Sequence, residues 1–307
     1  MLKINNEFQG TSCKFSYLNI NIIAFGTSEF YGIIGRGKLS LFYYDNYNLK
    51  YIKNFKNFYT ENSIFDIEFN KINKNLIFIA LGNGNLNIYN FNNNNLNPFK
   101  KYKLHNNEIF SINFNNKFNN ILASSSTDKT LKITDINNGK IINNFIFNNI
   151  IYSNCWHNNF NNLIACSFSK ECKIFDIKIQ KEIFNFNNNN NEIMTCDFNK
   201  INNYYFLFGN SNGLIYLFDI RNNIKPVFIY NNHKLNVKKI IFSPFDENIF
   251  LSCSYDMNIN LWNINNSFPL KIYKHHNEFV NDINFNLFNK KIVCSTSFDN
   301  SLCIFNI

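Results

Sequence analysis

The feature that most constrains the fold is a pair of intervals that occurs three times along the chain. His233 precedes Asp256 by 23 residues, and Asp256 precedes Trp262 by 6. The same intervals relate two further sets of residues, which are His105, Asp128 and Thr134, and His276, Asp299 and Phe305. Between His233 and Ile264, three apolar runs are separated by polar turns, a pattern typical of an antiparallel meander. The sequence is therefore built from repeats of a small β unit.

Seven such units can be traced. The residues expected to close the third strand of each unit are Phe42, Tyr89, Thr134, Phe175, Phe218, Trp262 and Phe305, spaced by 47, 45, 41, 43, 44 and 43 residues. The first strands are expected to end at Phe15, Phe69, Phe114, Trp156, Phe198, Phe242 and Phe285. A period in the low forties with several strands per unit predicts an all-β fold, a seven-bladed β-propeller.

Each blade of a propeller needs a fourth, outer strand. The candidates are 50–55, 99–102, 140–147, 182–186, 227–230 and 270–273. The seventh unit has none, so we expect Leu2–Phe8 to join the last blade and close the ring. The asparagine runs 92–95 and 187–191 are expected to be surface loops. With 4 prolines and 10 glycines there is no linker composition, which favours one domain over residues 1–307.

The formal net charge of +9 raises the possibility of nucleic acid or an anionic membrane surface as a partner. The basic residues are scattered singly or in pairs, such as Lys238–Lys239, so we interpret them as a solvated surface and predict no nucleic-acid partner. The 8 cysteines contain no C-x-x-C pair and fall mostly in strand-like runs, which favours buried thiols over a metal site. We predict no cofactor. No apolar run reaches the length of about 18 residues that spans a bilayer, and we expect a soluble, unsecreted protein.

The units resemble WD repeats, which carry a His before the first strand, an Asp in the tight turn and a Trp-Asp pair closing the third strand. The pair occurs in altered form at Thr134-Asp135, Phe175-Asp176, Phe218-Asp219 and Trp262-Asn263. The resemblance implies a structural hydrogen-bond network for His105, Asp128, His233, Asp256, Trp262, His276 and Asp299, completed by Ser252 or Ser254 in the best-preserved unit. Since the trio of Ser, His and Asp repeats and lacks a nucleophile elbow, we predict that the chain is not an enzyme.

Several stretches are more specifically similar to the peroxin-7 family of receptors for the type-2 peroxisomal targeting signal. They are 25–42, 63–70, 150–156, 218–228, 242–263 and 275–285. The resemblance implies a cytoplasmic receptor that shuttles to the peroxisome. Such a receptor binds an N-terminal signal helix of cargo proteins, joins an import co-receptor and docking proteins, and makes peripheral rather than integral contact with the membrane. A general WD-repeat scaffold or substrate adaptor is the alternative.

The signal of that family begins Arg-Leu and ends His-Leu with five residues between, so its basic and apolar side chains form adjacent strips on a helix. A complementary face would combine carboxylates with apolar groups. Residues at the start of first strands, or just before the tight-turn Asp, are expected to lie at one end of a propeller. This rule selects as the cargo-signal site Phe65, Asp66, Glu108, Phe110, Ile150, Tyr152, Glu192, Met194, Tyr255, Glu278 and Phe279, with Ser63, Thr127, Lys238 and Phe298 beside them. The carboxylates are predicted to attract Arg and His, and the aromatic rings to hold the leucines.

Overall fold

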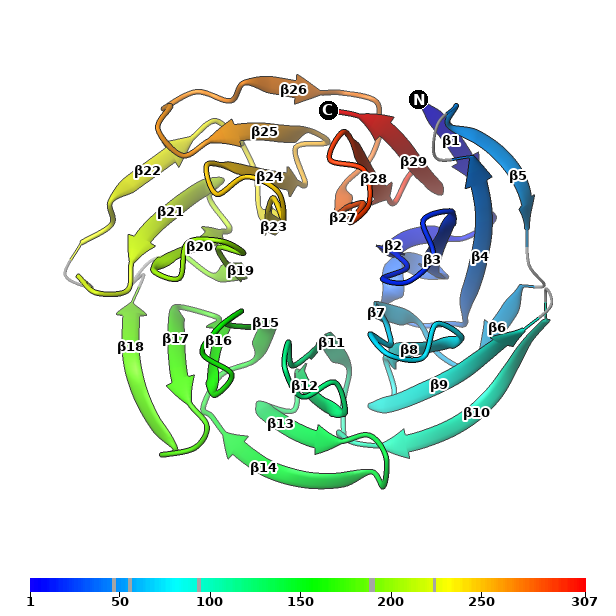
Figure 1. The fold of residues 1–307 in the computed structure, drawn as a ribbon, viewed down its shortest axis with the longest axis horizontal. Helices are drawn as coiled ribbons and strands as arrows, with labels where there is room; N and C mark the ends of the chain where they lie inside the picture. Colours follow the sequence, from blue (N-terminus) through cyan, green and yellow to red (C-terminus); the bar gives the residue numbers. More distant parts are fainter. Residues whose placement is uncertain (46–47, 55–56, 93–94, 188–190, 223–224) are drawn as a thin grey trace. The chain divides into compact units, whose positions relative to one another are not determined.

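The fold is a set of β-sheets that follow one another along the chain (Figure 1). A computed structural model describes residues 1–45, 48–54, 57–92, 95–187, 191–222 and 225–307. The contacts separate two compact units, called here the first unit (Met1–Ile112 with Asn281–Ile307) and the second unit (Asn113–Val280). The division falls within β11 (Ile109–Phe114) and at the start of β27 (Val280–Phe285). The prediction of a single domain over residues 1–307 stays a prediction.

Three sheets lie wholly or mostly in the first unit. Sheet one has the order β2 (Gln9–Phe15), β3 (Ile22–Ser28), β4 (Gly37–Asp45), β5 (Lys50–Asn54), and β6 (Phe58–Thr60) also pairs with β4. Sheet two has the order β10 (Asn95–Lys103), β9 (Asn85–Asn92), β8 (Leu76–Leu81), β7 (Ile64–Phe69). Sheet seven has the order β1 (Leu2–Asn5), β29 (Ser301–Asn306), β28 (Ile292–Ser297), β27 (Val280–Phe285).

The remaining four sheets continue the same pattern. Sheet three contains β11 (Ile109–Phe114), β12 (Ile121–Ser126), β13 (Thr130–Asp135) and β14 (Lys140–Ile146). Sheet four contains β15 (Ile151–Trp156), β16 (Leu163–Phe168), β17 (Glu171–Asp176) and β18 (Lys181–Asn187). Sheet five contains β19 (Ile193–Phe198), β20 (Tyr205–Asn210), β21 (Leu214–Asp219) and β22 (Phe228–Asn231). Sheet six contains β23 (Val237–Phe242), β24 (Ile249–Ser254), β25 (Ile259–Asn263) and β26 (Lys271–Tyr273).

The predicted fold class, an all-β seven-bladed β-propeller, is confirmed. All seven first strands end at the predicted residues, and every predicted third-strand residue is buried. The N-terminal strand joins the last sheet, as predicted, because Leu2 to Asn5 pair antiparallel with Ile304 to Ser301. In the described residues the one helix is η1 (Phe30–Gly32), a single 3₁₀ turn, and no helix there has the length and apolar character of a membrane span.

The outer strands differ from expectation in their ends. β10 starts at Asn95 rather than at residue 99, and β22 and β26 each start one residue late. β1 ends at Asn5 instead of Phe8. The predicted end of the first outer strand at Phe55, and residues 93–94 and 188–190 of the asparagine runs, lie outside the described residues.

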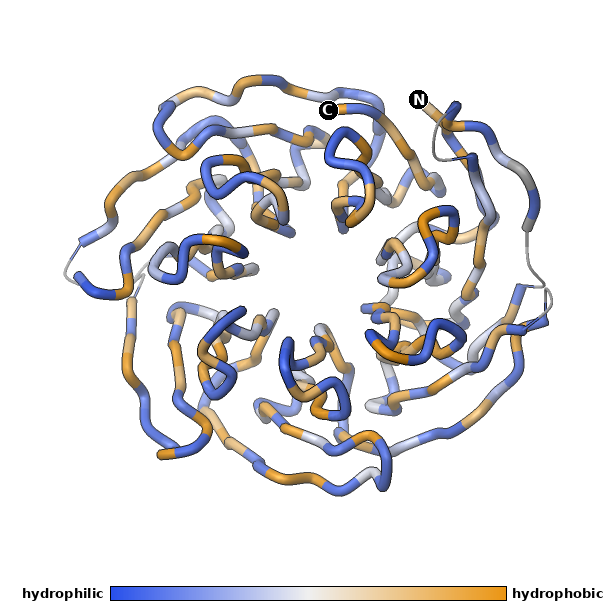
Figure 2. The backbone as a smooth tube through the Cα atoms, in the orientation of Figure 1, coloured by the Kyte–Doolittle hydropathy of each residue, from blue (hydrophilic) through white to orange (hydrophobic). Residues whose placement is uncertain are grey.

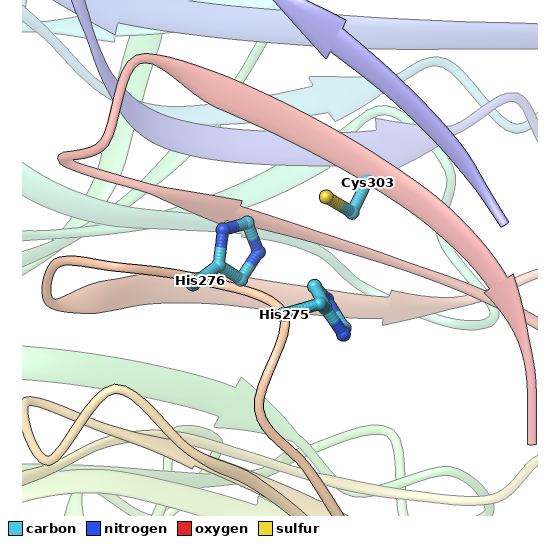
Figure 3. A group of neighbouring side chains, drawn as sticks. All are labelled: His275, His276 and Cys303. Carbon is cyan, nitrogen blue, oxygen red and sulfur yellow. The ribbon is translucent and has the colours of Figure 1, made fainter.

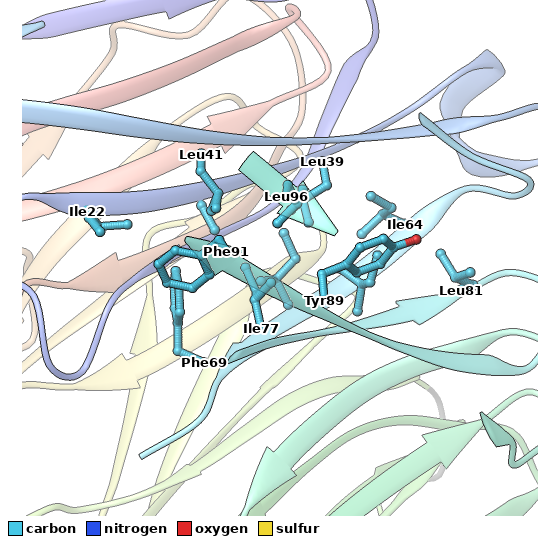
Figure 4. Close-up of a cluster of buried hydrophobic side chains, with 13 residues drawn as sticks. Ile22, Leu39, Leu41, Ile64, Phe69, Ile77, Leu81, Tyr89, Phe91 and Leu96 are labelled. Carbon is cyan, nitrogen blue, oxygen red and sulfur yellow. The ribbon is translucent and has the colours of Figure 1, made fainter. Parts of the chain in front are cut away.

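Apolar side chains from successive sheets interlock in the core. In the first unit one cluster combines Ile22, Leu39 and Leu41 of sheet one with Phe69, Ile77 and Tyr89 of sheet two (Figure 4). Burying one such side chain contributes about 1.5–3 kcal/mol. All eight cysteines are buried, which confirms their predicted role as core residues.

Buried carboxylates connect the first strands of neighbouring sheets. Asp282 Oδ2 accepts a hydrogen bond from the N–H of Cys13 at 3.0 Å, within the first unit. In the second unit, Asp197 Oδ2 accepts one from the N–H of Phe242 at 2.9 Å. A carboxylate that accepts from a backbone N–H satisfies a donor that would otherwise be buried without a partner. The first strands, which contain or closely follow most of the predicted binding residues, are therefore fixed by polar as well as apolar contacts.

Candidate functional site

The best-preserved unit contains a four-residue hydrogen-bond network in sheet six. Asp256 Oδ2 lies 2.9 Å from His233 Nδ1, and Ser252 Oγ lies 2.7 Å from His233 Nε2. The Trp262 indole N–H donates to the same Ser252 Oγ at 2.8 Å. Ser254, the other candidate, instead donates its hydroxyl to the Leu235 carbonyl. Ser252 is fully buried and its oxygen is engaged by Trp262, so it is not placed to attack a substrate.

The network also fixes the charge of Asp256. Burial favours the neutral acid, but hydrogen bonds and charge from His233, together with backbone N–H donors, lower the pKa of Asp256 to about 2. The carboxylate stays ionised at neutral pH and accepts a further hydrogen bond from the N–H of Lys234. The network therefore ties the segment before β23 to the turn between β24 and β25.

The other predicted network residues lie at equivalent places in their own units. His105 and His276 are buried before β11 and β27. Asp128 Oδ1 accepts hydrogen bonds from the N–H and the hydroxyl of Thr130. Asp299 accepts from the N–H of Ser301 and forms an ion pair with Lys3 at 3.2 Å, which attaches β1 to the last sheet.

Backbone hydrogen bonds place the segments chosen by the sequence rule next to each other within a sheet. The Gly82 N–H donates to the Ser63 carbonyl at 3.0 Å, and the Tyr255 N–H donates to the Asn236 carbonyl at 3.0 Å. Glu192 and Ser211 are joined in the same way, by Ser211 N–H to Glu192 O at 2.8 Å. In these three sheets, the start of the first strand and the turn between the second and third strands therefore lie at one end.

Four predicted binding residues belong to the first unit. Phe65 and Phe110 are half-buried, and their ring centroids lie 5.2 Å apart. Glu108 directly precedes β11 and is half-buried. Asp66 differs, because it is buried and accepts hydrogen bonds from the N–H groups of Ile67 and Ile112 at 2.9 and 2.8 Å. Its carboxylate therefore joins β7 to β11.

The second unit holds the other seven predicted binding residues. Tyr255 and Phe279 stack with ring centroids 4.6 Å apart and an interplanar angle of 13°. The Tyr152 hydroxyl donates to Glu192 Oε1 at 3.2 Å. Burial, and then the charge of Glu192, raise the pKa of Tyr152 to about 12, so this hydroxyl remains a donor at neutral pH.

The remaining three differ in burial. Ile150 is half-buried and Glu278 is exposed. Met194 is only 9% exposed and belongs to the hydrophobic core rather than to the surface. In this unit the structure thus places two glutamates, Glu192 and Glu278, just before first strands. Phe279 of the aromatic stack directly follows Glu278 in the sequence. Exposed carboxylates with flat aromatic surfaces can bind a basic and apolar helix face.

A segment that the sequence rule did not select lies beside Phe65. The turn between β3 and β4 exposes four large apolar side chains, Phe30, Tyr31, Ile33 and Ile34. Gly32 has a φ of +83°, and a Cβ placed there would stand 3.6 Å from the Phe65 ring. Tyr31 packs edge-on against Phe298, with centroids 5.2 Å apart. The concentration of large apolar residues within positions 30–34 is the sequence signal that could have identified this turn.

An ion pair closes this turn. The Arg36 N–H donates to Glu29 Oε2 at 2.7 Å, and the Arg36 guanidinium donates to Glu29 Oε1 at 3.1 Å. The hydrogen bond from the Arg36 backbone, followed by that from its side chain, holds the pKa of Glu29 below its usual range. Phe30 and Tyr31 have φ values of 46° and 60°, which are uncommon for residues other than glycine. The turn is therefore held in one shape with its apolar side chains outward.

Imidazole and thiol groups occur near the start of β27 and in β29. Figure 3 draws His275 and His276, whose ring centroids lie 4.6 Å apart, and it also draws Cys303 of β29. Burial raises the pKa of Cys303 to about 11. Burial likewise raises the pKa of Cys155, Cys166 and Cys196 well above the usual value, so these thiols are neutral at physiological pH and weak as metal ligands. The prediction of no metal site stays a prediction.

Comparison with known proteins agrees with the repeat pattern. A family model described as WD domain, G-beta repeat (WD40) matches residues 96–135, 224–263 and 267–306. These segments end in β13, β25 and β29, the strands that close with Thr134, Trp262 and Phe305. The chain is thus a β-propeller with WD repeats.

Among individual proteins, the chain is similar to three peroxisomal targeting signal 2 receptors. The receptor of Saccharomyces cerevisiae is 26% identical, with 83% of this chain and 81% of that protein covered. The Schizosaccharomyces pombe receptor is 26% identical, covering 83% of this chain and 82% of its own length. The human receptor is 27% identical, covering 83% of this chain and 79% of its own length.

Proposed function

We propose that this chain is a receptor for the type-2 peroxisomal targeting signal and binds the signal helix of cargo proteins. The observation that carries the proposal is the similarity to three receptors of that name over 83% of the chain, beside the match of three segments of this chain to the WD40 model. Cargo recognition by such a receptor requires binding and release, with no bond made or broken. We therefore propose a non-enzymatic role.

Electrostatics supports the choice of residues. The chain carries a formal net charge of +9, yet Glu108, Glu192 and Glu278 recur at the starts of first strands. We propose that they attract the Arg and His of the signal, with the buried charge of Asp66 adding to the local negative potential. A carboxylate near a guanidinium steers the encounter and fixes the register more than it adds affinity.

Apolar contacts would supply the remaining recognition. We assign the leucines of the signal to Phe65 and Phe110 in the first unit, and to Tyr152, Tyr255 and Phe279 in the second unit, with Ile150 and Met194 behind them. Tyr31 and Phe298 extend the aromatic surface around Phe65. Aromatic rings present a large contact area at a low cost in conformational entropy.

The resemblance also suggests the cellular setting. We propose that the receptor acts with an import co-receptor and docking proteins, moves between cytoplasm and peroxisome, and touches the membrane peripherally. A general scaffold or adaptor would share the fold but would not select the signal. A preference for peptides with the correct spacing between Arg-Leu and His-Leu therefore distinguishes a signal receptor from a scaffold or adaptor.

The test is direct binding of a fluorescent signal peptide, followed by anisotropy. We expect Glu108→Lys combined with Glu192→Lys to weaken binding by about 10-fold or more, since each substitution replaces attraction by repulsion. The matched control, Glu182→Lys with Glu247→Lys, makes the same charge change on β18 and in the β23–β24 turn and should alter binding by less than about 2-fold. Thermal unfolding checks that both variants are folded.

Two results would contradict the proposal. Undiminished binding by the folded Glu108→Lys, Glu192→Lys variant would remove the acidic site. Equal binding of a peptide with the same composition but shuffled Arg, Leu and His positions would favour a scaffold or adaptor over a signal receptor.

A further inference from the structure

The turns between first and second strands share a design that exposes an apolar side chain. In the first unit, Ser16 Oγ accepts hydrogen bonds from the N–H groups of Leu18 and Asn19. Asn70 Oδ1 does the same for residues 72 and 73, and Asn286 Oδ1 for residues 288 and 289. The residue held at the tip is in each case apolar and exposed: Leu18 (44%), Ile72 (71%) and Phe288 (48%).

Side chains link these three turns to each other. The Asn286 amide donates to the Tyr44 hydroxyl at 2.6 Å, and that hydroxyl donates to the Ile20 carbonyl at 3.0 Å. The Lys71 ammonium lies 5.5 Å from the centroid of the Tyr17 ring. Turns 286–291, 16–21 and 70–75 therefore form one surface, called here the turn surface. Figure 2 shows its hydrophobic residues in orange among hydrophilic ones in blue.

The turn surface is also basic. Lys74, Lys290 and Lys291 are exposed, and none of them forms an ion pair with another described residue. The nearby carboxylate of Glu68 is buried and already paired with Lys14 at 2.9 Å. The free lysine charge is thus available to an external anion.

The equivalent turns of the second unit are different. They also expose apolar tips, at Phe118, Phe160, Ile201 and Phe245. However, Lys200 is paired with Asp197 at 2.6 Å, and the turn of sheet six carries Asp246 and Glu247. The turn of sheet three has an exposed lysine, Lys117, beside Phe118. Across the second unit the turn lysines are matched by these carboxylates, so the excess of positive charge belongs to the turns of the first unit.

We propose that the turn surface is a docking site for an anionic lipid bilayer. Apolar side chains that enter the interface, combined with lysines that contact acidic headgroups, are the physical requirements for peripheral membrane binding. A helical protein partner would need a groove, whereas these apolar groups stand at the tips of three separate turns. The turns are held by Asx and Ser hydrogen bonds, so the surface is already shaped before it meets the membrane.

This inference extends the peripheral contact of the proposed function by naming its surface and lipid chemistry. It can fail while signal binding holds, because the two use different residues. The first experiment is co-sedimentation of the full chain with vesicles of phosphatidylcholine alone, or with about 30% phosphatidylserine added. We expect binding to the anionic vesicles only, and loss of that binding when salt rises from about 0.1 to 0.5 M.

Two variants locate the surface. Lys74→Glu with Lys290→Glu and Lys291→Glu should reduce the partition coefficient by about 100-fold, since each lysine near an anionic surface adds substantially to attraction. Ile72→Ser with Phe288→Ser should reduce it by about 10-fold through loss of apolar insertion. The control variant Lys234→Glu with Lys274→Glu changes charged residues before β23 and β27 and should bind vesicles within about 2-fold of wild type.

The signal peptide is measured with the same preparations. Normal peptide binding with lost vesicle binding supports the assignment and leaves the proposed function intact. The assignment is overturned if wild type ignores anionic vesicles, if the lysine variant binds them as wild type does, or if the chain binds polyglutamate but no vesicle.

Discussion

Sheets five and six belong to the same unit and share the same strand pattern, but they differ at one buried position of the second strand, which is polar in sheet six and aromatic in sheet five. In sheet six, Trp262 pairs across the strands with Phe250, and Ser252 follows two residues later. In sheet five, Phe218 pairs with Phe206, so Phe208 takes the place of Ser252. Sheet six has a hydrogen-bond network at this point, whereas sheet five has stacked rings, with Phe208 and Phe218 5.5 Å apart at 20°.

The difference shows that the two sheets share the order and pairing of their strands, and not the hydrogen-bond network typical of WD repeats. A buried network needs every donor and acceptor to be matched, whereas a cluster of rings needs only volume and contact. The two sheets should therefore respond differently to substitution and to pH.

The largest effect is expected in sheet five. Phe208 is fully buried and contacts the rings of Phe186, Phe206, Tyr216 and Phe218. Phe208→Ala should lower the free energy of unfolding by about 3–5 kcal/mol, because it removes these contacts and leaves a cavity. Urea denaturation measures the loss, with exposed Phe245→Ala as a control that changes less than about 0.5 kcal/mol. A loss below about 1 kcal/mol for Phe208→Ala would show that the ring cluster is not stabilising.

Sheet six should depend on a hydroxyl instead. Ser252→Ala leaves His233 Nε2 and Trp262 Nε1 buried without their partner, and we expect a loss of about 2–3 kcal/mol. Combining it with Trp262→Phe should cost less than the two single losses added together, since both remove the same hydrogen bond. Strict additivity in urea denaturation would contradict a shared network.

Sheet four provides an intermediate case. Ile164 pairs with Phe175, so Cys166 stands where sheet six has Ser252, within an apolar cluster. Cys166→Ser should destabilise by about 1–2 kcal/mol, because the new hydroxyl has neither the histidine nor the indole of sheet six. Thermal unfolding of this variant beside Ser252→Cys tests the point in both directions. A Cys166→Ser variant more stable than wild type would contradict the conclusion that a hydroxyl at this position needs the histidine and indole partners of sheet six.

The smallest effect is the response to acid. The pKa of Asp256 is about 2 in the folded chain, below its ordinary value of 3.8, so its ionised form stabilises the folded state above pH 3.8. That contribution should decline as pH falls from about 4 to 2, by up to about 1 kcal/mol after solvent screening. Unfolding measured against pH should show this decline in wild type and not in Asp256→Asn. Parallel curves would contradict it.

Much of the fold could be predicted because the residues that end the strands recur at a regular spacing in every unit. Buried aromatic residues such as Phe69 and Phe242 close each first strand, so a spacing argument locates them without knowledge of their contacts. The outer strands were less predictable. In β10, Pro98 suggests a strand start, but Asn95 to Pro98 also pair with β9, with a register shift just after the proline. An outer edge tolerates a residue without an N–H.

One strand was missed for a related reason. Among the described residues, β5 pairs with the end of β4, and the start of β4 at Gly37 to Leu39 pairs with a further strand, Phe58 to Thr60. Three residues are too few to give a periodic signal. The structural role of the Asp66 carboxylate could not be predicted from the sequence either, because its hydrogen-bond partner Ile112 is 46 residues away in the chain. The sequence predicts which residues start the strands, while the hydrogen bonds decide which carboxylates are committed to structure.

The pairing of β1 with β29 has a consequence for how the molecule is made. Leu2–Asn5 is translated nearly three hundred residues before its partner Ser301–Asn306. The sheet that contains both strands cannot close until β29 has been translated, so β1 must remain accessible to the nascent chain, or to chaperones, for that interval.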